Sequence, residues 1–370
     1  MAEEPKNRRR AGRTPWLKIA RAVPLAFDVR KIVLGTIALI LIQAGWSALD
    51  VLLPATATVT PDILDFNGRF SEPALPRIAP GPVFRSALWR ITEPARVLIG
   101  PMIDLFAIDR GIAWTGHALL GVLWAVVVMG IVGGAVSRSA VSEVGKGDRA
   151  TIVESLRFAL RSSRSLIAAP LFPLGAAAVC GLICAGFGAL YRLPIVGAPL
   201  AGVTFFIPLA LGLVMAVLLI DFAAAWAFIH VSVAADAESS LDALSRAFSY
   251  VNRRPVQFVA CATAAWLAGA VGLAAVDVLA RAAVHLAAWG LSFTAPPAIL
   301  AGLGRPGPDA ALDSLAGMAP FFWARVVKLL AHAWIYGYYW SAASVIYLTL
   351  RRDVDGTPAT EIKDEAIEML

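Results

Sequence analysis

Long apolar runs without charges dominate the pattern of hydrophobic and polar positions along the chain. Several exceed the roughly 18 residues that mark a candidate membrane span. In hydrocarbon only helices and closed barrels satisfy every backbone polar group, and runs of this length favour helices. The pattern predicts spans at residues 32–53, 111–137, 165–191, 208–234, 255–276 and 329–350. We therefore expect an all-α fold, a polytopic transmembrane helix bundle of about six spans.

Amphipathic segments lead directly into the first, third and fifth of these spans. In residues 239–255, Leu244 and Phe248 fall on one face of a predicted helix that ends in arginines. Residues 151–167 follow a similar pattern, and residues 14–31 follow a looser one. Basic amphipathic helices of this kind lie at the level of the lipid headgroups.

An apolar segment interrupted by Gly or Pro separates the two spans of each pair. These segments are residues 93–106, 193–206 and 282–300, and each is interfacial, re-entrant or spanning. One order of elements thus occurs three times in the same orientation, and parallel repeats are a known way to build membrane proteins. The similar stretches GHALLGVLW (116–124) and AHAWIYGYYW (331–340) support the equivalence of the first and third units. The predicted repeats are residues 14–137, 151–235 and 239–350, and the membrane domain covers residues 32–350.

Composition agrees with a membrane protein. Of the residues, 59% are hydrophobic and 16% are charged, whereas a typical soluble domain has about 25% charged residues. Residues 1–31 form a basic segment with nine Lys and Arg residues, and residues 351–370 form an acidic tail. The apolar run from Ile32 is too long for a secretory signal peptide, so we expect a retained signal anchor.

The distribution of positive charge predicts the orientation. With the basic segment in the cytoplasm, the segments on that side carry 21 of the 32 Lys and Arg residues. This excess follows the positive-inside rule. It predicts a multi-pass protein of the cytoplasmic (inner) membrane with its N-terminus and C-terminus in the cytoplasm. The basic helices then face anionic lipid headgroups, and nothing else in the chain indicates binding of nucleic acid.

Asp221 interrupts the longest apolar run, residues 193–235. If the span is 208–234, this carboxylate lies near mid-depth, where it is costly unless it is paired, hydrated or protonated. If the span is 197–220, Asp221 lies at the inner headgroups and the cost mostly disappears. The first alternative makes Asp221 a candidate for transport, for proton transfer or for a structural hydrogen bond between helices.

Four residues of the second and sixth spans are candidates for a groove that holds lipid or ligand. They are His117, His332, Tyr336 and Tyr339. Ordinary packing at the membrane interface and between helices is the simpler interpretation of each. The two histidines are only half of a usual metal site, so we expect no metal.

The chain lacks the residue patterns of familiar catalytic and cofactor sites. Its three cysteines form no CxxC pair. The sequence contains no phosphate-binding loop, nucleophile elbow, zinc-protease motif or dinucleotide motif. We therefore expect no cofactor, and an enzyme is the less favoured class.

Two stretches carry a resemblance to a known family. They are DALSRAFSYVNRRPVQFV (242–259) and YWSAASVIYLTLRRDVDG (339–356). Over about residues 140–355 the chain resembles bacterial six-span proteins of the membrane-domain family found with glycerophosphodiester phosphodiesterases. The resemblance implies a helical domain of the inner membrane. No phosphodiesterase motif occurs, so it implies no such activity.

Three functional classes remain open. The leading one is a protein without catalysis that scaffolds or regulates a protein partner at the cytoplasmic face, or organises lipid. The second is a transporter or channel for a small solute or lipid that uses Asp221 within the membrane. The third and weakest is a membrane enzyme that acts on lipid through the polar residues 54–110.

Overall fold

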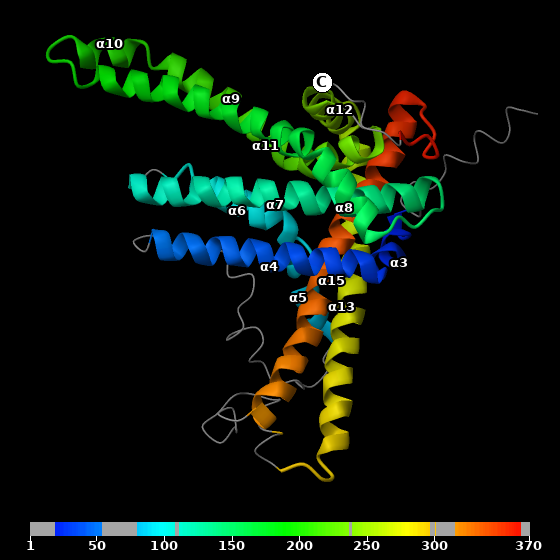
Figure 1. Ribbon diagram of the computed structural model, residues 1–370. Helices are drawn as coiled ribbons and strands as arrows, with labels where there is room; N and C mark the ends of the chain where they lie inside the picture. Colours follow the sequence, from blue (N-terminus) through cyan, green and yellow to red (C-terminus); the bar gives the residue numbers. More distant parts are fainter. Residues whose placement is uncertain are drawn as a thin grey trace, which may run out of the picture.

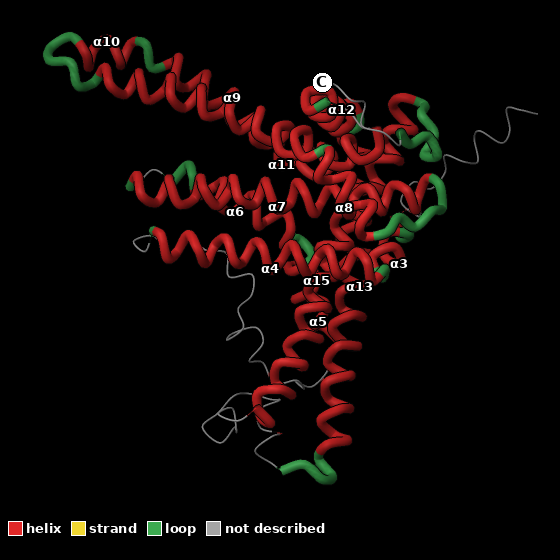
Figure 2. Tube along the Cα trace, viewed as in Figure 1, coloured by secondary structure: helices red, strands yellow, loops and turns green. Residues whose placement is uncertain are grey.

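The computed structural model describes residues 19–53, 80–107, 111–236, 239–296, 300 and 315–363. Of these residues 86% are helical and none forms a strand (Figure 2). The all-α prediction is therefore confirmed for the described part of the chain. Residues 54–79 and 108–110 of the polar stretch 54–110 that the enzyme hypothesis invoked lie outside it.

Three helical hairpins radiate from a common centre (Figure 1). Arm 1 consists of α4 (Val29–Leu52) and α7 (Ile112–Gly145), arm 2 of α9 (Ser163–Leu190) and α11 (Phe206–Asp236), and arm 3 of α13 (Pro255–Leu291) and α15 (Leu315–Asp355). The final halves of α7, α11 and α15 pack against one another at the centre. We call this region, residues 125–145, 222–236 and 331–355, the hub.

Three short helices cover the hub. They are α3 (Ala22–Ala26), α8 (Ile152–Arg161) and α12 (Ser240–Arg253). In sequence each of them leads into an arm, but each packs mainly on the second helix of a different arm. Thus α8 packs on α7, α12 packs on α11, and α3 packs on α15. The short helices therefore link the three arms in a closed ring.

Side-chain caps begin three of the helices at the hub. Asp28 accepts a hydrogen bond from the backbone N–H of Arg30 and begins α4. Thr151 and Glu154 form a reciprocal capping box at the start of α8. Ser239 caps α12. Each cap satisfies a backbone donor that no helical carbonyl reaches, and so fixes where its helix begins.

A further helical hairpin lies between arms 1 and 3. It consists of α5 (Pro80–Arg90), which packs on α13, and α6 (Glu93–Asp104), which packs on α7. The sequence predicted the apolar segment 93–106 but missed α5, because residues 80–90 mix apolar and basic side chains. In arm 2 the short helix α10 (Gly197–Val203) joins the two long helices at the end far from the hub.

Five described helices are long and apolar enough to cross a membrane: α4, α7, α9, α11 and α13. Each contains one predicted span to within one residue at either end. The sixth predicted span, residues 329–350, lies within the continuous helix α15, whose Trp, Tyr and Ser residues make it less apolar. A six-span arrangement therefore stays a prediction. The fifth predicted span, residues 255–276, lies within α13, which continues as one helix to Leu291 because no Gly or Pro occurs between Asp277 and Trp289.

Aromatic rings and glycines form the centre of the hub. The ring centroid of His230 lies 4.5 Å from that of Trp226 and 5.1 Å from that of Trp340. Gly133 of α7 lies directly against the Trp340 indole, where any Cβ would collide. Small residues thus let the helices approach closely, as is common between helices in membranes.

Candidate functional site

Buried charged side chains are the features of this chain that most need a functional explanation. They include Lys31, Glu93, Asp236, Asp277 and Arg351. A charge inside a helical membrane bundle is costly unless it is paired, and such residues commonly mark functional sites. These residues fall into two groups, one at the hub and one between arms 1 and 3.

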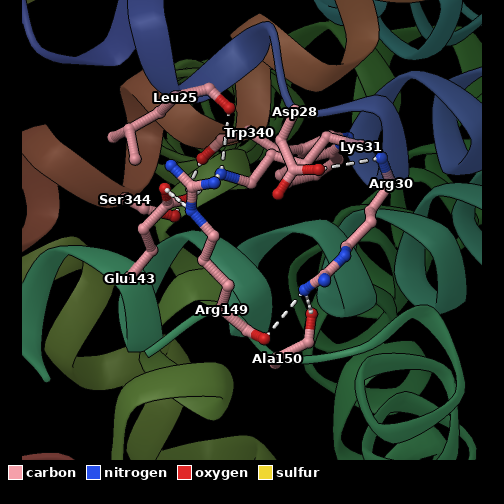
Figure 3. Close-up of polar contacts among 9 residues, drawn as sticks. All are labelled: Leu25, Asp28, Arg30, Lys31, Glu143, Arg149, Ala150, Trp340 and Ser344. Atoms are coloured by element: carbon pink, nitrogen blue, oxygen red, sulfur yellow. Dashed lines mark hydrogen bonds and ion pairs between the residues drawn. The ribbon is translucent and has the colours of Figure 1, made fainter. Parts of the chain in front are cut away.

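The first hub cluster surrounds Lys31, which is fully buried (Figure 3). Its Nζ donates to Oε2 of Glu143 at 2.8 Å and to the carbonyl of Leu25 at 3.0 Å. Nε of Arg149 donates to Oε1 of the same carboxylate at 3.2 Å. Glu143 at the end of α7 is thus held between a buried and an exposed cation, which ties α7 to the start of α4.

Local structure explains how Lys31 reaches this position. The Asp28 cap begins α4 three residues earlier, and a Cβ added at Gly337 of α15 would lie 3.3 Å from the Lys31 Cβ. The neighbouring Arg30 points the other way and donates to the carbonyls of Arg149 at 2.8 Å and Ala150 at 2.9 Å (Figure 3). Two successive basic residues therefore join α4 to the end of α7 and to the loop before α8.

The second hub cluster surrounds Asp236, the last residue of α11. Its carboxylate accepts from the Tyr347 hydroxyl at 2.9 Å and from Arg246 at 3.3 Å. Arg351 lies 3.3 Å from its other oxygen. The Tyr347 hydroxyl also lies 3.0 Å from that of Ser232. One carboxylate thus joins α11 to α12 and α15.

Tyr250 of α12 extends this cluster toward the end of α15. Its hydroxyl donates to Asp355, and its ring lies 5.3 Å from that of Tyr347. Burial, with a smaller contribution from the Asp355 hydrogen bond, raises the pKa of the Tyr250 phenol. The phenol is therefore neutral and acts as a hydrogen-bond donor rather than as a base.

The other group lies where the turn between α5 and α6 meets arm 3. Arg90 lies 2.5 Å from Asp277 of α13. Nε2 of His332 in α15 lies 2.5 Å from a carboxylate oxygen of Glu93. We call these four residues the joint cluster. Trp266 of α13 adds a hydrogen bond to the Leu88 carbonyl at 2.8 Å, so the hairpin is fixed against arm 3 by polar contacts.

Arm 1 contains a related pair of its own. Nε2 of His117 in α7 lies 3.5 Å from Asp50 near the end of α4. The His117 ring also lies 5.6 Å from Trp46. Both predicted histidines therefore have a carboxylate partner, but in separate pairs, His117 within arm 1 and His332 at the α5–α6 turn.

Asp221 lies at the edge of the hub. It is half-buried and accepts a hydrogen bond at 3.3 Å from the exposed side chain of Asn252, at the end of α12. Its side chain thus faces an amphipathic helix that the sequence places at the headgroups. The depth of Asp221 in a membrane stays a prediction.

The tyrosines of the predicted groove have different surroundings. Tyr336 is buried and faces Gly35 of α4, with its Cβ 3.3 Å from the position that a Gly35 Cβ would take. Tyr339 is half-buried, with its ring 5.2 Å from that of Trp340. None of the contacts described here joins two of the four predicted groove residues. These contacts therefore do not support the groove hypothesis.

Sequence reasoning missed most of the buried charges because it treated the ends of the spans as loops. A usable signal was present, since the hub ends of α7, α11 and α15 carry Glu143, Asp236 and Asp353. Asp277 was placed outside the fifth span because the predicted span ended one residue earlier. Within the described ranges, no group of three or more His, Cys, Asp or Glu side chains is arranged to hold a metal ion.

Comparisons with known proteins add no family or fold assignment. No family model, no curated protein and no solved structure matches the chain. The functional argument therefore rests on the residues and their geometry.

Proposed function

We propose that this chain is an integral scaffold of the cytoplasmic membrane that organises anionic lipid and docks a protein partner at its cytoplasmic face. In this proposal six spans form three parallel two-span repeats. Both ends of the chain face the cytoplasm, and the hub lies on that side.

The ring of short helices supports the repeat. Helices α8, α12 and α3 take corresponding places on α7, α11 and α15. Arms 1 and 3 also share a hydrogen bond between their two helices. In each arm, an aromatic side chain of the second helix donates a hydrogen bond to a backbone carbonyl of the first. Trp124 donates to Leu41 at 2.9 Å, and Tyr338 donates to Ala265 at 2.6 Å.

One observation carries the proposal of a scaffold. The buried charged side chains of the two hub clusters are paired, whereas the apolar faces of the arms stay exposed, as at Leu182, Leu213 and Ile220. Exposed apolar surface of this extent marks contact with lipid or with another protein. A fixed hub with open arms suits a protein that holds other molecules in place.

Exposed arginines on the short helices support the lipid side of the proposal. Arg157, Arg161 and Arg164 lie within about two turns at α8 and the start of α9, and all are exposed. Basic residues near an anionic membrane surface each contribute about 1 kcal/mol to its attraction. The three residues together therefore favour anionic over neutral headgroups.

The test is lipid retention in native-lipid nanodiscs, measured by mass spectrometry. We expect phosphatidylglycerol to be retained over phosphatidylcholine, and a variant with Arg157, Arg161 and Arg164 all changed to Gln to lose about tenfold or more of that preference. Arg192→Gln, at the exposed far end of arm 2, is the matched control and should change nothing. Equal retention by the triple variant would contradict the proposal.

A transporter is the second candidate, and the joint cluster is the observation that favours it. Glu93 and His332 form a buried acid–histidine pair at a contact between helices, and such pairs occur in proton pathways. Proton flux into proteoliposomes that is lost in Glu93→Gln, with Glu361→Gln as the control, would favour transport. Loss of flux in Asp221→Asn would support the version of this hypothesis that uses Asp221.

A further inference from the structure

Residues 356–363, which follow α15, form an ordered segment across the hub, and we call it the strap. Gly356 reverses the chain with a φ of 73°, a conformation that favours glycine. The strap then runs back over the ends of α7 and α11.

The hub binds the strap through its backbone. Arg351 donates to the carbonyl of Glu361 at 2.6 Å. Arg138 donates to the carbonyl of Lys363 at 2.8 Å, and the N–H of Lys363 donates to the carbonyl of Ala235 at 3.0 Å. Both backbone groups of Lys363 are thus paired with the hub, one with a side chain and one with a carbonyl. Before it the strap makes a turn, in which the N–H of Glu361 donates to the carbonyl of Pro358 at 3.1 Å.

A single side chain of the strap is buried. Ile362 is 8% exposed and packs on Gly145, the last residue of α7, where a Cβ would collide with it and with the Ala359 carbonyl. Its neighbours Glu361 and Lys363 are exposed. The hub therefore contacts the main chain of the strap and the buried side chain of Ile362, and the half-buried Ala359 packs beside it.

The receiving surface is held in place independently of the strap. We call it the strap groove: Arg138, Gly145, Ala235 and Arg351. Arg351 is 2% exposed and is fixed by Asp236. Arg138 donates to the Ala234 carbonyl at 2.9 Å and lies 4.7 Å from the ring centroid of Phe158. Both guanidinium groups are therefore anchored by residues outside the strap.

We propose that the strap groove is the docking site for a segment of the protein partner, with an aliphatic side chain in the place of Ile362. The strap is its occupant in the free protein and competes with the partner. This inference rests on the proposed function. A groove that binds the main chain and one aliphatic side chain can bind segments of many different sequences. The strap competes with them because it is tethered, which gives it an effective concentration near the millimolar range. The groove thus exchanges occupants when the partner segment binds more tightly than the strap.

The experiment empties the groove in the full-length chain and offers the strap sequence in trans. Ile362→Asp places a charge in the aliphatic position and releases the strap. The probe is a fluorescent peptide of residues 356–363, GTPATEIK. We expect fluorescence anisotropy to report at least about tenfold tighter binding to Ile362→Asp than to the wild type, where the tethered strap competes. The same peptide with Asp in place of Ile should not bind.

Two further variants place the peptide in the groove. In the Ile362→Asp background, Gly145→Val fills the aliphatic position and should abolish binding. Gly175→Val, at a position with no neighbour within 4 Å, should leave it unchanged. Equal binding to the wild type and Ile362→Asp, or to both peptides, would overturn the proposal.

A second measurement covers the case in which Ile362→Asp does not fold. Gly145→Val in the otherwise wild-type chain should expel the strap and speed hydrogen exchange at the Lys363 amide, while the hub amides stay protected. Unchanged exchange at Lys363 would contradict the proposed fit. Peptide binding and lipid retention are separate readouts, so loss of the first alone refutes the groove and leaves the scaffold standing.

Discussion

The two halves of α11 show opposite relations between polarity and burial. Residues 206–220 are almost wholly apolar and largely exposed, with Leu213 67% exposed. Residues 222–236 contain Trp226, His230 and Asp236, and all three are buried. Asp221 marks the boundary between the halves. A soluble helix would bury its more apolar half, so the inversion is compatible with a first half that faces hydrocarbon.

The comparison teaches what holds this molecule together. Lipid is as apolar as leucine, so apolar side chains gain little by leaving it for another helix. Close packing at glycines, aromatic contacts and paired polar groups must then stabilise the hub. The following predictions test this difference between hub and arm, from the largest expected effect to the smallest.

Removing the buried cation should have the largest effect. Lys31→Met leaves Glu143 with Arg149 alone, and breaking a buried pair costs about 3–5 kcal/mol. We expect a large fall in thermal stability in detergent. The double variant Lys31→Met with Glu143→Leu removes both charges and should recover most of it. A single variant as stable as the wild type would show that the pair does not stabilise the hub.

Two leucines of α9 allow the same substitution in both environments. Leu166 is fully buried against the hub, whereas Leu182 is 72% exposed. Leu166→Ala leaves a cavity and should cost about 2 kcal/mol or more. Leu182→Ala should change stability by less than about 0.5 kcal/mol. Equal losses in the unfolding of both variants would contradict the assignment of arm 2 to lipid.

Two glycines provide a matched pair of substitutions with a smaller expected effect on stability. Gly133→Ala forces a methyl group against Trp340 and should cost about 1–3 kcal/mol. Gly212→Ala, in the exposed half of α11 with no neighbour within 4 Å, should be neutral or slightly stabilising. Thermal unfolding in one detergent measures both, and a stable Gly133→Ala would show that the hub is loosely packed.

The capping box of α8 should give the smallest effect, and one that depends on pH. Hydrogen bonds from the backbone and hydroxyl of Thr151 lower the pKa of Glu154 below its ordinary 4.5. The ionised carboxylate therefore stabilises α8 above that pH, and the contribution is lost as the pH falls through the lowered value. Thr151→Ala should return this pKa toward 4.5, measured by carboxyl NMR titration, and should fray α8. If the pKa of Glu154 were the same in Thr151→Ala as in the wild type, the capping box would not be what lowers it.

The sequence predicted helices better than it predicted contacts. Apolar runs located the six long helices in the described part of the chain, because a helix that crosses a membrane must be both long and apolar throughout. The ring formed by α3, α8 and α12 could not be predicted, since it depends on which arm each short helix packs against. Lys31 and Asp236 were missed because the sequence does not distinguish a charged residue at the end of a span that faces water from one that pairs with an opposite charge.

The ring of short helices also bears on how the protein is made. Of the described helices, α3 is synthesised first, but it packs on α15, which is synthesised last. Lys31 meets Glu143 once α7 emerges, and it gains its cover from α15 only after the other arms have been inserted. The hub is therefore completed in one late step. A ribosome stalled before α15 should leave the N-terminal unit open to chaperones and proteases.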